Sequence, residues 1–314
     1  MQERLKNSGF SDWTPDRLPS LEGKTYFITG GNSGIGLEAA KMLVAAGGDV
    51  IITSRSLDKG HKAASEASRT GSGNVSVVQL DLTDMASIKA AAHDVRTHTD
   101  KLDGHINNAG IMQTPQGKTK DGFETQLGTN HLGHFLLTGL MFDLVKKASV
   151  RIVTVSSIAH KYGRINFTDL MLSENYSPTR AYTQSKLANL MFALELDRRL
   201  TAAGSTVTSF ACHPGYSNTA LQSTGPTGPL KAIYTLTNKL MAQPSFNGAI
   251  PTVLCAAGEE AQPGGYYGPQ KMNDARGPVS DAKVTATARN EKVAARLWEE
   301  SEKLVGFEWA GVLP

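Results

Sequence analysis

A tyrosine and a lysine stand four residues apart in the segment Tyr182-Thr183-Gln184-Ser185-Lys186. In a helix this spacing places both side chains on one face. A phenol with a pKa of about 10 is a poor base at neutral pH, but a nearby positive charge favours the phenolate and lowers that pKa. The pair is therefore a candidate for proton transfer, although an isolated pair of this kind is also common on helix surfaces.

A second set of chemical groups follows the segments that we expect to be strands. In an open parallel sheet, ligands bind beyond the carboxyl ends of the strands, so the residues at those ends form one site. The groups found there are Thr29-Gly30, Ser54-Arg55, Asp81-Leu82, Asn107-Asn108-Ala109-Gly110, Ser156-Ser157 and His213-Pro214-Gly215. Tyr182 lies between the serines and a P-G-x-x-x-T segment that ends at Thr219, and this joint spacing is specific.

A glycine-rich stretch joins the first expected strand to the first expected helix. A helix N-terminus presents unpaired N–H groups and a partial positive charge, which stabilise an anion such as pyrophosphate. Gly30 and Gly34 would let the backbone turn sharply near the phosphates, and Gly36 would let the helix pack tightly on the sheet. The residues expected at the cofactor are Gly30, Asn32, Ser33, Gly34, Ile35 and Gly36.

Strands and helices are expected to alternate along the chain. The apolar runs are continuous, which indicates strands that are covered on both faces, and right-handed crossovers then give a doubly wound, Rossmann-type parallel α/β sheet. Strands are expected over 26–29, 50–53, 75–80, 104–107, 151–155, 206–211 and 265–267. Helices are expected over 37–46, 57–69, 84–97, 123–147, 180–203, 245–257 and 279–304.

We predict one domain over residues 23–314, preceded by an N-terminal arm over 1–22. A single α/β domain can reach this size. The segment 220–243 is rich in Gly, Pro and Thr and follows the sixth strand, where a flap over the substrate would lie. A plain surface insertion is the alternative for that segment.

The composition excludes several classes of function. The net charge of +3 comes without a dense Lys/Arg block, so nucleic acid is not an expected partner. The longest apolar runs have strand length, so no membrane span is expected, and residues 1–12 show no apolar signal-peptide core. Two cysteines, Cys212 and Cys255, are too few for a disulfide framework and favour a reducing cytoplasm. His131 and His134 lack the further ligands that a zinc site needs, so no metal is expected.

Taken together, these motifs resemble the short-chain dehydrogenase/reductase family over about residues 21–304. The matching segments are T-G-x-x-x-G-I-G, N-N-A-G at 107–110, the asparagine of Thr129-Asn130-His131, the serine, Y-x-x-x-K and P-G-x-x-x-T. Two details are similar to the branch that contains retinol dehydrogenases and protochlorophyllide reductase. They are the segment from Thr129 to Phe135 and the spacing of 25 positions between Ser157 and Tyr182.

The resemblance implies a role for each matching residue. Tyr182 would be the acid/base, and Ser157, which directly precedes an apolar residue, would bond the substrate oxygen in preference to Ser156. Lys186 would bond the nicotinamide ribose and supply positive charge, and Asn130 would hold a water that links Lys186 to solvent. Further cofactor contacts are expected from Ser54, Arg55, Asp81, Leu82, Asn108, Ala109, Gly110, Pro214, Gly215 and Thr219.

The expected cofactor is NADP(H) rather than NAD(H). Enzymes that use NAD typically have Asp or Glu at the end of the second strand, where the carboxylate accepts hydrogen bonds from the ribose 2′-hydroxyl. This chain has Ser54 and Arg55 there, and a guanidinium can hold a 2′-phosphate through two parallel hydrogen bonds. Arg55 as a solvated surface residue remains the alternative.

The resemblance implies interconversion of a carbonyl and an alcohol on a small-molecule substrate. Residues beside the motifs, Ile111, Met112, His160 and Tyr216, are expected to border an apolar pocket. Two other functions remain open, namely reduction of an activated C=C bond and NADP(H) binding without catalysis. The sequence leaves open the substrate, the direction of the reaction and whether the protein is a monomer or a homo-oligomer.

Overall fold

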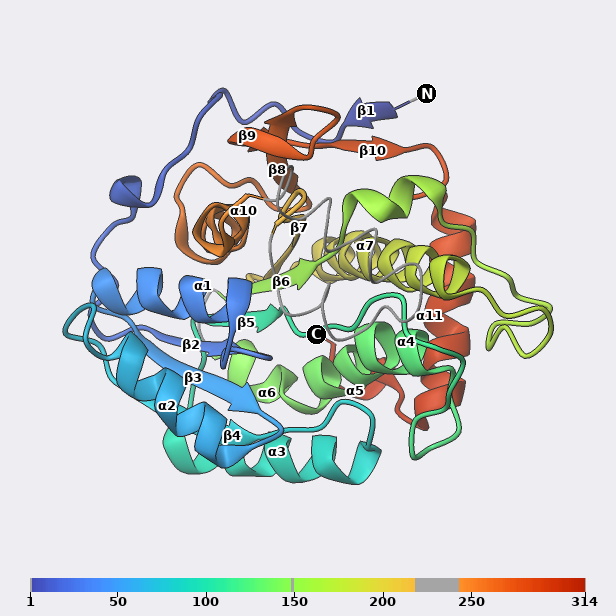
Figure 1. Ribbon diagram of the computed structural model, residues 1–314, viewed down its shortest axis with the longest axis horizontal. Helices are drawn as coiled ribbons and strands as arrows, with labels where there is room; N and C mark the ends of the chain where they lie inside the picture. The colour runs from blue at the N-terminus through green and yellow to red at the C-terminus, as the bar shows by residue number, and fades with distance from the viewer. Residues whose placement is uncertain (1, 148–149, 218–242, 314) are drawn as a thin grey trace.

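An eight-stranded sheet forms the centre of the computed structural model, which describes residues 2–147, 150–217 and 243–313 (Figure 1). The strand order is β4-β3-β2-β5-β6-β7-β8-β9, with β9 antiparallel to β8 and the other neighbours parallel. The strands are β2 (Thr25–Ile28), β3 (Asp49–Ser54), β4 (Val75–Gln79), β5 (Gly104–Asn107), β6 (Arg151–Val155), β7 (Thr208–Cys212), β8 (Tyr266–Lys271) and β9 (Arg276–Asp281). The predicted doubly wound α/β fold is confirmed.

Helices cover both faces of the sheet and divide the apolar core into two clusters. One cluster packs α1 (Gly34–Ala45), α2 (Leu57–Ala67) and α10 (Ser245–Ala257) on one face. The other includes side chains of α3 (Met85–His98), α5 (Gly133–Leu140), α7 (Pro178–Ala202) and α11 (Glu291–Val305). Because each strand is covered on both sides, its apolar run needs no alternation. The helix expected over 245–257 forms even though Pro251 lies inside it.

The long helix expected over 123–147 is wrong. It is divided into α4 (Thr125–Leu127), a wider π turn labelled η2 (Gly128–Leu132), α5 and α6 (Phe142–Val145). In the π turn the Gly133 N–H donates to the carbonyl of Gly128, five residues earlier. The turn contains Asn130, whose side chain bonds the backbone of Ile111 instead of facing solvent. A tertiary contact therefore interrupts a segment that local pattern alone assigns to one helix.

The helix expected over 279–304 is wrong in its first half. Residues Arg276–Asp281 form β9, Lys283–Thr285 form β10, and the helix α11 begins only at Glu291, where the Asn290 side chain caps Val293 N–H. Three residues of positive φ, Met272 to Asp274, turn the chain back from β8. Pairing with β8 stabilises β9, and the sequence pattern carries no sign of that pairing.

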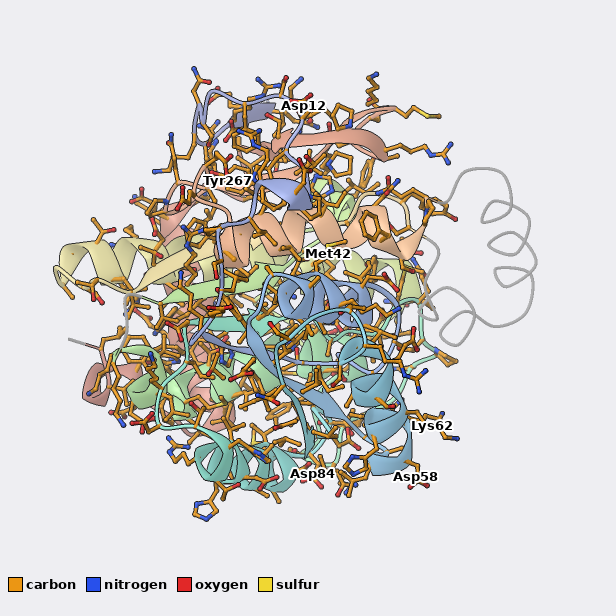
Figure 2. The ribbon with its side chains drawn as sticks, turned by 90° about the vertical axis from the view of Figure 1, so that its left-hand side faces the viewer. Asp12, Met42, Asp58, Lys62, Asp84 and Tyr267 are labelled. Carbon is orange, nitrogen blue, oxygen red and sulfur yellow. The ribbon has the colours of Figure 1, made fainter. Side chains whose placement is uncertain are left out.

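The N-terminal arm lies along the C-terminal strands. Its short strand β1 (Gln2–Arg4) pairs with β10, the 3-10 turn η1 spans Pro15–Arg17, and Trp13 is buried with its indole N–H donating to Glu260. Figure 2 shows Asp12 and Tyr267 at one end of the molecule and α2, with Asp58 and Lys62, at the other. Within the described residues, no helix combines the length and the apolar character that crossing a membrane requires.

Candidate active site

A cavity of about 550 Å³ opens at the carboxyl ends of the parallel strands. Most of the sequence-predicted site residues line it, although they come from six separate stretches of chain. Those residues are Gly30, Asn32, Ser33, Gly34, Ile35, Gly36, Ser54, Arg55, Asp81, Leu82, Asn108, Ala109, Gly110, Ile111, Met112, Tyr182, Lys186 and Pro214. The position agrees with the general rule for ligands of open α/β sheets.

The glycine loop has the backbone that a phosphate cradle needs. Gly30 and Gly34 both have positive φ, 66° and 55°, a region that glycine enters at little cost. A Cβ atom on Gly36 would lie 2.5 Å from the carbonyl oxygen of Gly30 and from Asn108 Nδ2. The first turn of α1 therefore lies close against the loop, with its free N–H groups at the cavity.

Thr29 directly follows β2 and positions Asn108 and Ala109, which line the cavity. This role was not expected from the sequence. The Thr29 hydroxyl accepts hydrogen bonds from the backbone N–H groups of Asn108 and Ala109, both at 2.9 Å. The Asn108 side chain in turn donates to the Thr29 carbonyl at 2.8 Å. A short polar residue before the first glycine is the only sequence signal for this contact.

Two cations line the cavity where β3 ends. Arg55 follows β3, and Lys59 lies on the first turn of α2; both side chains are exposed. Ser54 and Ser56 stand beside them, and neither position carries a carboxylate. Arg55 was expected from the sequence, whereas Lys59 was not. Lys59 lies on the same side as the end of β3 only because α2 begins at Leu57.

Tyr182 and Lys186 lie on the second and third turns of α7 and share the cavity wall. Lys186 is 5% exposed, and its ammonium donates to the Val155 carbonyl at the end of β6 at 3.0 Å. Burial lowers the pKa of Lys186 to about 8. At neutral pH the side chain is therefore still mostly an ammonium, placed one helical turn from the phenol.

The side chains of Asn130 and Lys186 both lie close to Gly110. A Cβ atom on Gly110 would lie 3.1 Å from Asn130 Oδ1 and 3.5 Å from Lys186 Nζ. Asn130 Oδ1 accepts from the Ile111 N–H, while Nδ2 donates to the Ile111 carbonyl and to Ser185 Oγ. The asparagine is fully buried and holds the segment after β5 against α7.

The two serines after β6 have different environments. Ser156 is 1% exposed and donates its hydroxyl to the Lys186 carbonyl at 2.7 Å. The Ser157 hydroxyl accepts from the Ala159 N–H at 3.1 Å and caps the short 3-10 helix η3 (Ile158–Tyr162). The Ser157 hydroxyl still has its own proton to donate, whereas the proton of Ser156 is used within the protein.

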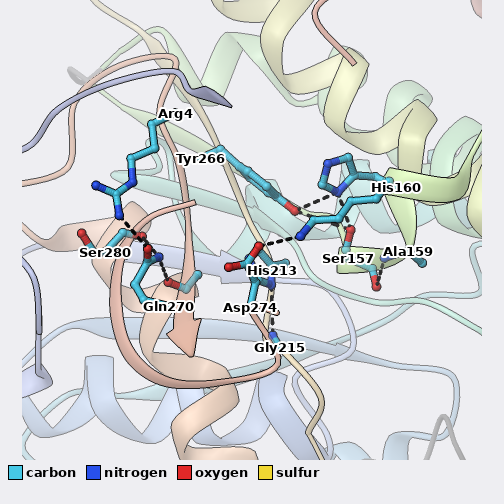
Figure 3. A network of polar contacts seen from close by, with 12 residues as sticks. Arg4, Ser157, Ala159, His160, His213, Gly215, Tyr266, Gln270, Asp274 and Ser280 are labelled. Carbon is cyan, nitrogen blue, oxygen red and sulfur yellow. Dashed lines mark hydrogen bonds and ion pairs between the residues drawn. The ribbon is translucent and has the colours of Figure 1, made fainter. Parts of the chain in front are cut away.

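His160 is not among the residues that line the cavity, where it was expected. Figure 3 shows its ring beside Ser157 and Tyr266. The His160 Nδ1 donates to the Ser157 carbonyl at 2.7 Å, and the Tyr266 hydroxyl approaches the same carbonyl at 3.5 Å. Burial lowers the pKa of His160 to about 4, which keeps the ring neutral. An ion pair of 2.6 Å between Lys161 and Asp274 fixes η3 to the turn between β8 and β9.

Asn130 and Ser157 also lie outside the set that lines the cavity, which contains Ser156. The other remaining predicted residues follow β7. Gly215 and Tyr216 are half-buried and lie outside the set that lines the cavity, and the Tyr216 N–H donates to the Ala275 carbonyl. Ser217 pairs with Gln243, whose side chain donates to the Pro214 carbonyl at 2.7 Å. Thr219 and nearly all of the expected flap over 220–243 lie outside the described residues.

Comparison with known proteins agrees with this geometry. Residues 24–228 match the short chain dehydrogenase family. The chain belongs to that family. It is 42% identical over 296 residues to Retinol dehydrogenase 12 of Mus musculus, covering 92% of this chain and 88% of the relative. It is 39% identical over 302 residues to Retinol dehydrogenase 13 of Homo sapiens, covering 92% and 86%.

A solved structure extends the match to the whole fold. A putative uncharacterized protein from Mycobacterium Paratuberculosis is 41% identical, with a TM-score of 0.79 and coverage of 95% of this chain and 99% of that one. The resemblance to the retinol dehydrogenase branch is thus confirmed. As a member of this family, the chain is an oxidoreductase that uses a nicotinamide cofactor, NAD or NADP, and acts on alcohol or carbonyl groups.

Proposed function

We propose that the chain is an NADP(H)-dependent oxidoreductase that interconverts an apolar ketone or aldehyde and its alcohol. One observation carries the proposal: the phenol of Tyr182 and the ammonium of Lys186 line the same cavity as the glycine loop, with Arg55 and Lys59 at the opposite end. The glycine cradle fits a dinucleotide, since a side chain on Gly36 would collide with the loop.

The proposed catalytic roles rest on the resemblance to the family, and the contacts of Lys186 and Asn130 support them. Tyr182 gives a proton to the substrate oxygen in reduction and takes it back in oxidation, while the Ser157 hydroxyl donates to the same oxygen. The Lys186 ammonium, fixed by the Val155 carbonyl, favours the phenolate through its charge. Asn130 holds Ile111 and Ser185 beside Lys186, and a water near Asn130 would link Lys186 to solvent. The bound nicotinamide supplies the hydride chemistry.

The preference for NADP(H) is assigned to Arg55 and Lys59. Arg55→Ala should raise KM for NADPH about tenfold or more, equivalent to about 1.4 kcal/mol, and leave KM for NADH little changed. Lys59→Ala should act in the same direction with a smaller effect, because an ammonium binds phosphate as a point charge. Lys62→Ala is the matched control, since Lys62 lies on α2 outside the cavity lining. Equal losses with both cofactors would remove the 2′-phosphate from the proposal.

The substrate class is inferred from the wall near Tyr182. Ile111, Met112 and Val155 line the cavity there, which favours a bulky apolar substrate. Because relatives at about 40% identity are named retinol dehydrogenases, retinal and retinol belong in the first substrate panel, beside smaller ketones and secondary alcohols. Turnover of polyanionic substrates alone would contradict the proposal.

The resemblance to the protochlorophyllide reductase branch keeps reduction of an activated C=C bond as the second candidate, and one enone decides between them. The allylic alcohol as product supports carbonyl reduction, and the saturated ketone supports C=C reduction. NADPH binding without turnover across the panel would indicate a binding protein instead. We also propose a cytoplasmic location, which the two buried free cysteines, Cys212 and Cys255, support.

A further inference from the structure

A buried histidine connects the two ends of the candidate site. His134 lies on the first turn of α5 and is 1% exposed. Its Nε2 is 2.8 Å from the hydroxyl of Thr29, and its Nδ1 is 2.9 Å from the carbonyl oxygen of Asn130. Thr29 and Asn130 are about 100 positions apart in the chain and hold different parts of the site, Thr29 at Asn108 and Ala109 and Asn130 at Ile111 and Ser185.

The partners fix the proton on this ring. A carbonyl oxygen can only accept, so Nδ1 carries the proton and donates it to Asn130. The Thr29 hydroxyl already accepts from two backbone N–H groups, so its single proton is donated. His134 Nε2, at 2.8 Å, is the nearer acceptor for that proton than the Ile106 carbonyl at 3.4 Å. Burial lowers the pKa of His134 to about 3, which keeps the ring neutral.

Each end of the chain of hydrogen bonds holds part of the site. Thr29 positions Asn108 and Ala109, which line the nucleotide end of the cavity. Asn130 lies in the π turn and holds Ile111 and Ser185, the residue that precedes Lys186. A displacement of the His134 ring would therefore move both Thr29 and Asn130.

We propose that His134 is a positioning residue that fixes the Thr29 hydroxyl relative to the Asn130 carbonyl. Through these two contacts, Asn108 and Ala109 keep their position relative to the catalytic Lys186. The inference rests on the proposed function in taking Asn130 and Lys186 as parts of the catalytic machinery. It goes beyond that function by assigning separate tasks to the two ring nitrogens.

Two substitutions separate the tasks. An Asn side chain places its amide at the distance of Nδ1, and a Gln side chain places its amide at the distance of Nε2. His134→Asn should keep the donor to Asn130 and raise Kd for NADPH about tenfold, with kcat at saturating cofactor within about threefold of wild type. His134→Gln should keep the acceptor for Thr29 and lower kcat about tenfold, with a shifted pH profile and little change in Kd. His134→Leu should lose both.

The controls distinguish positioning from general stability. His131 is equally buried but contacts Ser301, so His131→Asn and His131→Gln should lower the melting temperature without separating Kd from kcat. Equal changes of Kd and kcat in the two His134 variants, or no change in either, would overturn the proposal. Imidazole ¹H–¹⁵N NMR of the wild type gives a test without turnover, because a proton found on Nε2 of His134 also overturns it. Absence of wild-type turnover would count against the proposed function alone.

Discussion

The eight histidines, all within the described residues, divide the molecule into two unlike halves. In the nucleotide half, from β2 to α3, the three histidines are exposed on helix surfaces: His61, His93 and His98. In the catalytic half, from β5 onward, all five are buried: His105, His131, His134, His160 and His213. In the first half, the glycine loop and short residues at the strand ends line the cavity together with the cations Arg55 and Lys59. The second half positions long side chains through buried neutral polar groups.

The largest expected effect is a loss of stability in acid that originates in the catalytic half. Burial lowers the pKa of His105 and His160 to about 4 and of His131 and His134 to about 3. An unfolded histidine takes up a proton near pH 6.5, so unfolding binds protons and stability falls as the pH drops from 6.5 towards 4. At pH 5.5 each histidine costs about 1.4 kcal/mol, and the four together cost roughly 6 kcal/mol.

Denaturant unfolding at a series of pH values measures this effect. The free energy of unfolding should be nearly constant between pH 7 and pH 8 and should fall steeply below pH 6.5. His131→Gln should reduce the slope by about one proton. A flat stability between pH 7 and pH 5 would mean that the two halves do not differ in this respect.

The next effect concerns Tyr182. Tyr182→Phe should lower turnover by at least about 100-fold, because the variant has no proton to exchange with the substrate oxygen. Its affinity for NADPH should be nearly that of wild type, since the glycine loop and Arg55 are unchanged. Steady-state kinetics with a fluorescence titration of the cofactor measure both quantities. Near wild-type turnover would exclude Tyr182 from the mechanism, and a large loss of affinity would show that the two halves are not separable.

Substitutions of the two serines after β6 should change kcat to different extents in the same assay. Ser157→Ala should lower kcat roughly 10- to 100-fold through loss of a donor to the substrate oxygen. Ser156→Ala removes the hydrogen bond to the Lys186 carbonyl, so we expect a loss of about 1 kcal/mol of stability and a smaller change in kcat. The reverse order would assign the substrate contact to Ser156.

The smallest effect belongs to the nucleotide half. Gly36→Ala would place a methyl group 2.5 Å from the Gly30 carbonyl, so the loop has to shift and Kd for NADPH should rise about tenfold. The kcat at saturating cofactor should change little. Gly311→Ala is the matched control, because a Cβ atom there meets nothing within 4 Å. An unchanged Kd in Gly36→Ala would mean that the close approach at this glycine is not needed for binding.

The nucleotide half could be predicted almost completely from the sequence because its determinants are consecutive residues. The glycine loop and Ser54-Arg55 each follow a strand, and the order of strands brings them together with N-N-A-G, which follows β5 in the other half. Lys59 was not predicted, because its place at the cavity depends on where α2 begins. The same locality explains why the strands expected over 26–29 and 50–53 lie within one or two residues of β2 and β3.

In the catalytic half, Tyr182 and Lys186 line the cavity as expected from the sequence, but the contacts that support them were not expected. The spacing of Tyr182 and Lys186 is local, whereas the π turn at Asn130 depends on a contact with Ile111, 19 positions away. His160 was expected on the cavity wall because it is adjacent to the serine motif, yet its ring bonds backward to Ser157. The strand β9 depends on pairing with β8. Pairings between distant residues leave no periodic trace in the local pattern.

The N-terminal arm has a consequence for the order in which the chain folds. Ser8 bonds Asp281, 273 positions away, and Tyr267. During synthesis the arm leaves the ribosome before its partners, so these hydrogen bonds close only after Tyr267 and Asp281 have emerged. Closing so long a loop is slow as well as entropically unfavourable. Until then the antiparallel edge at β10 stays unpaired, and nascent chains can associate there.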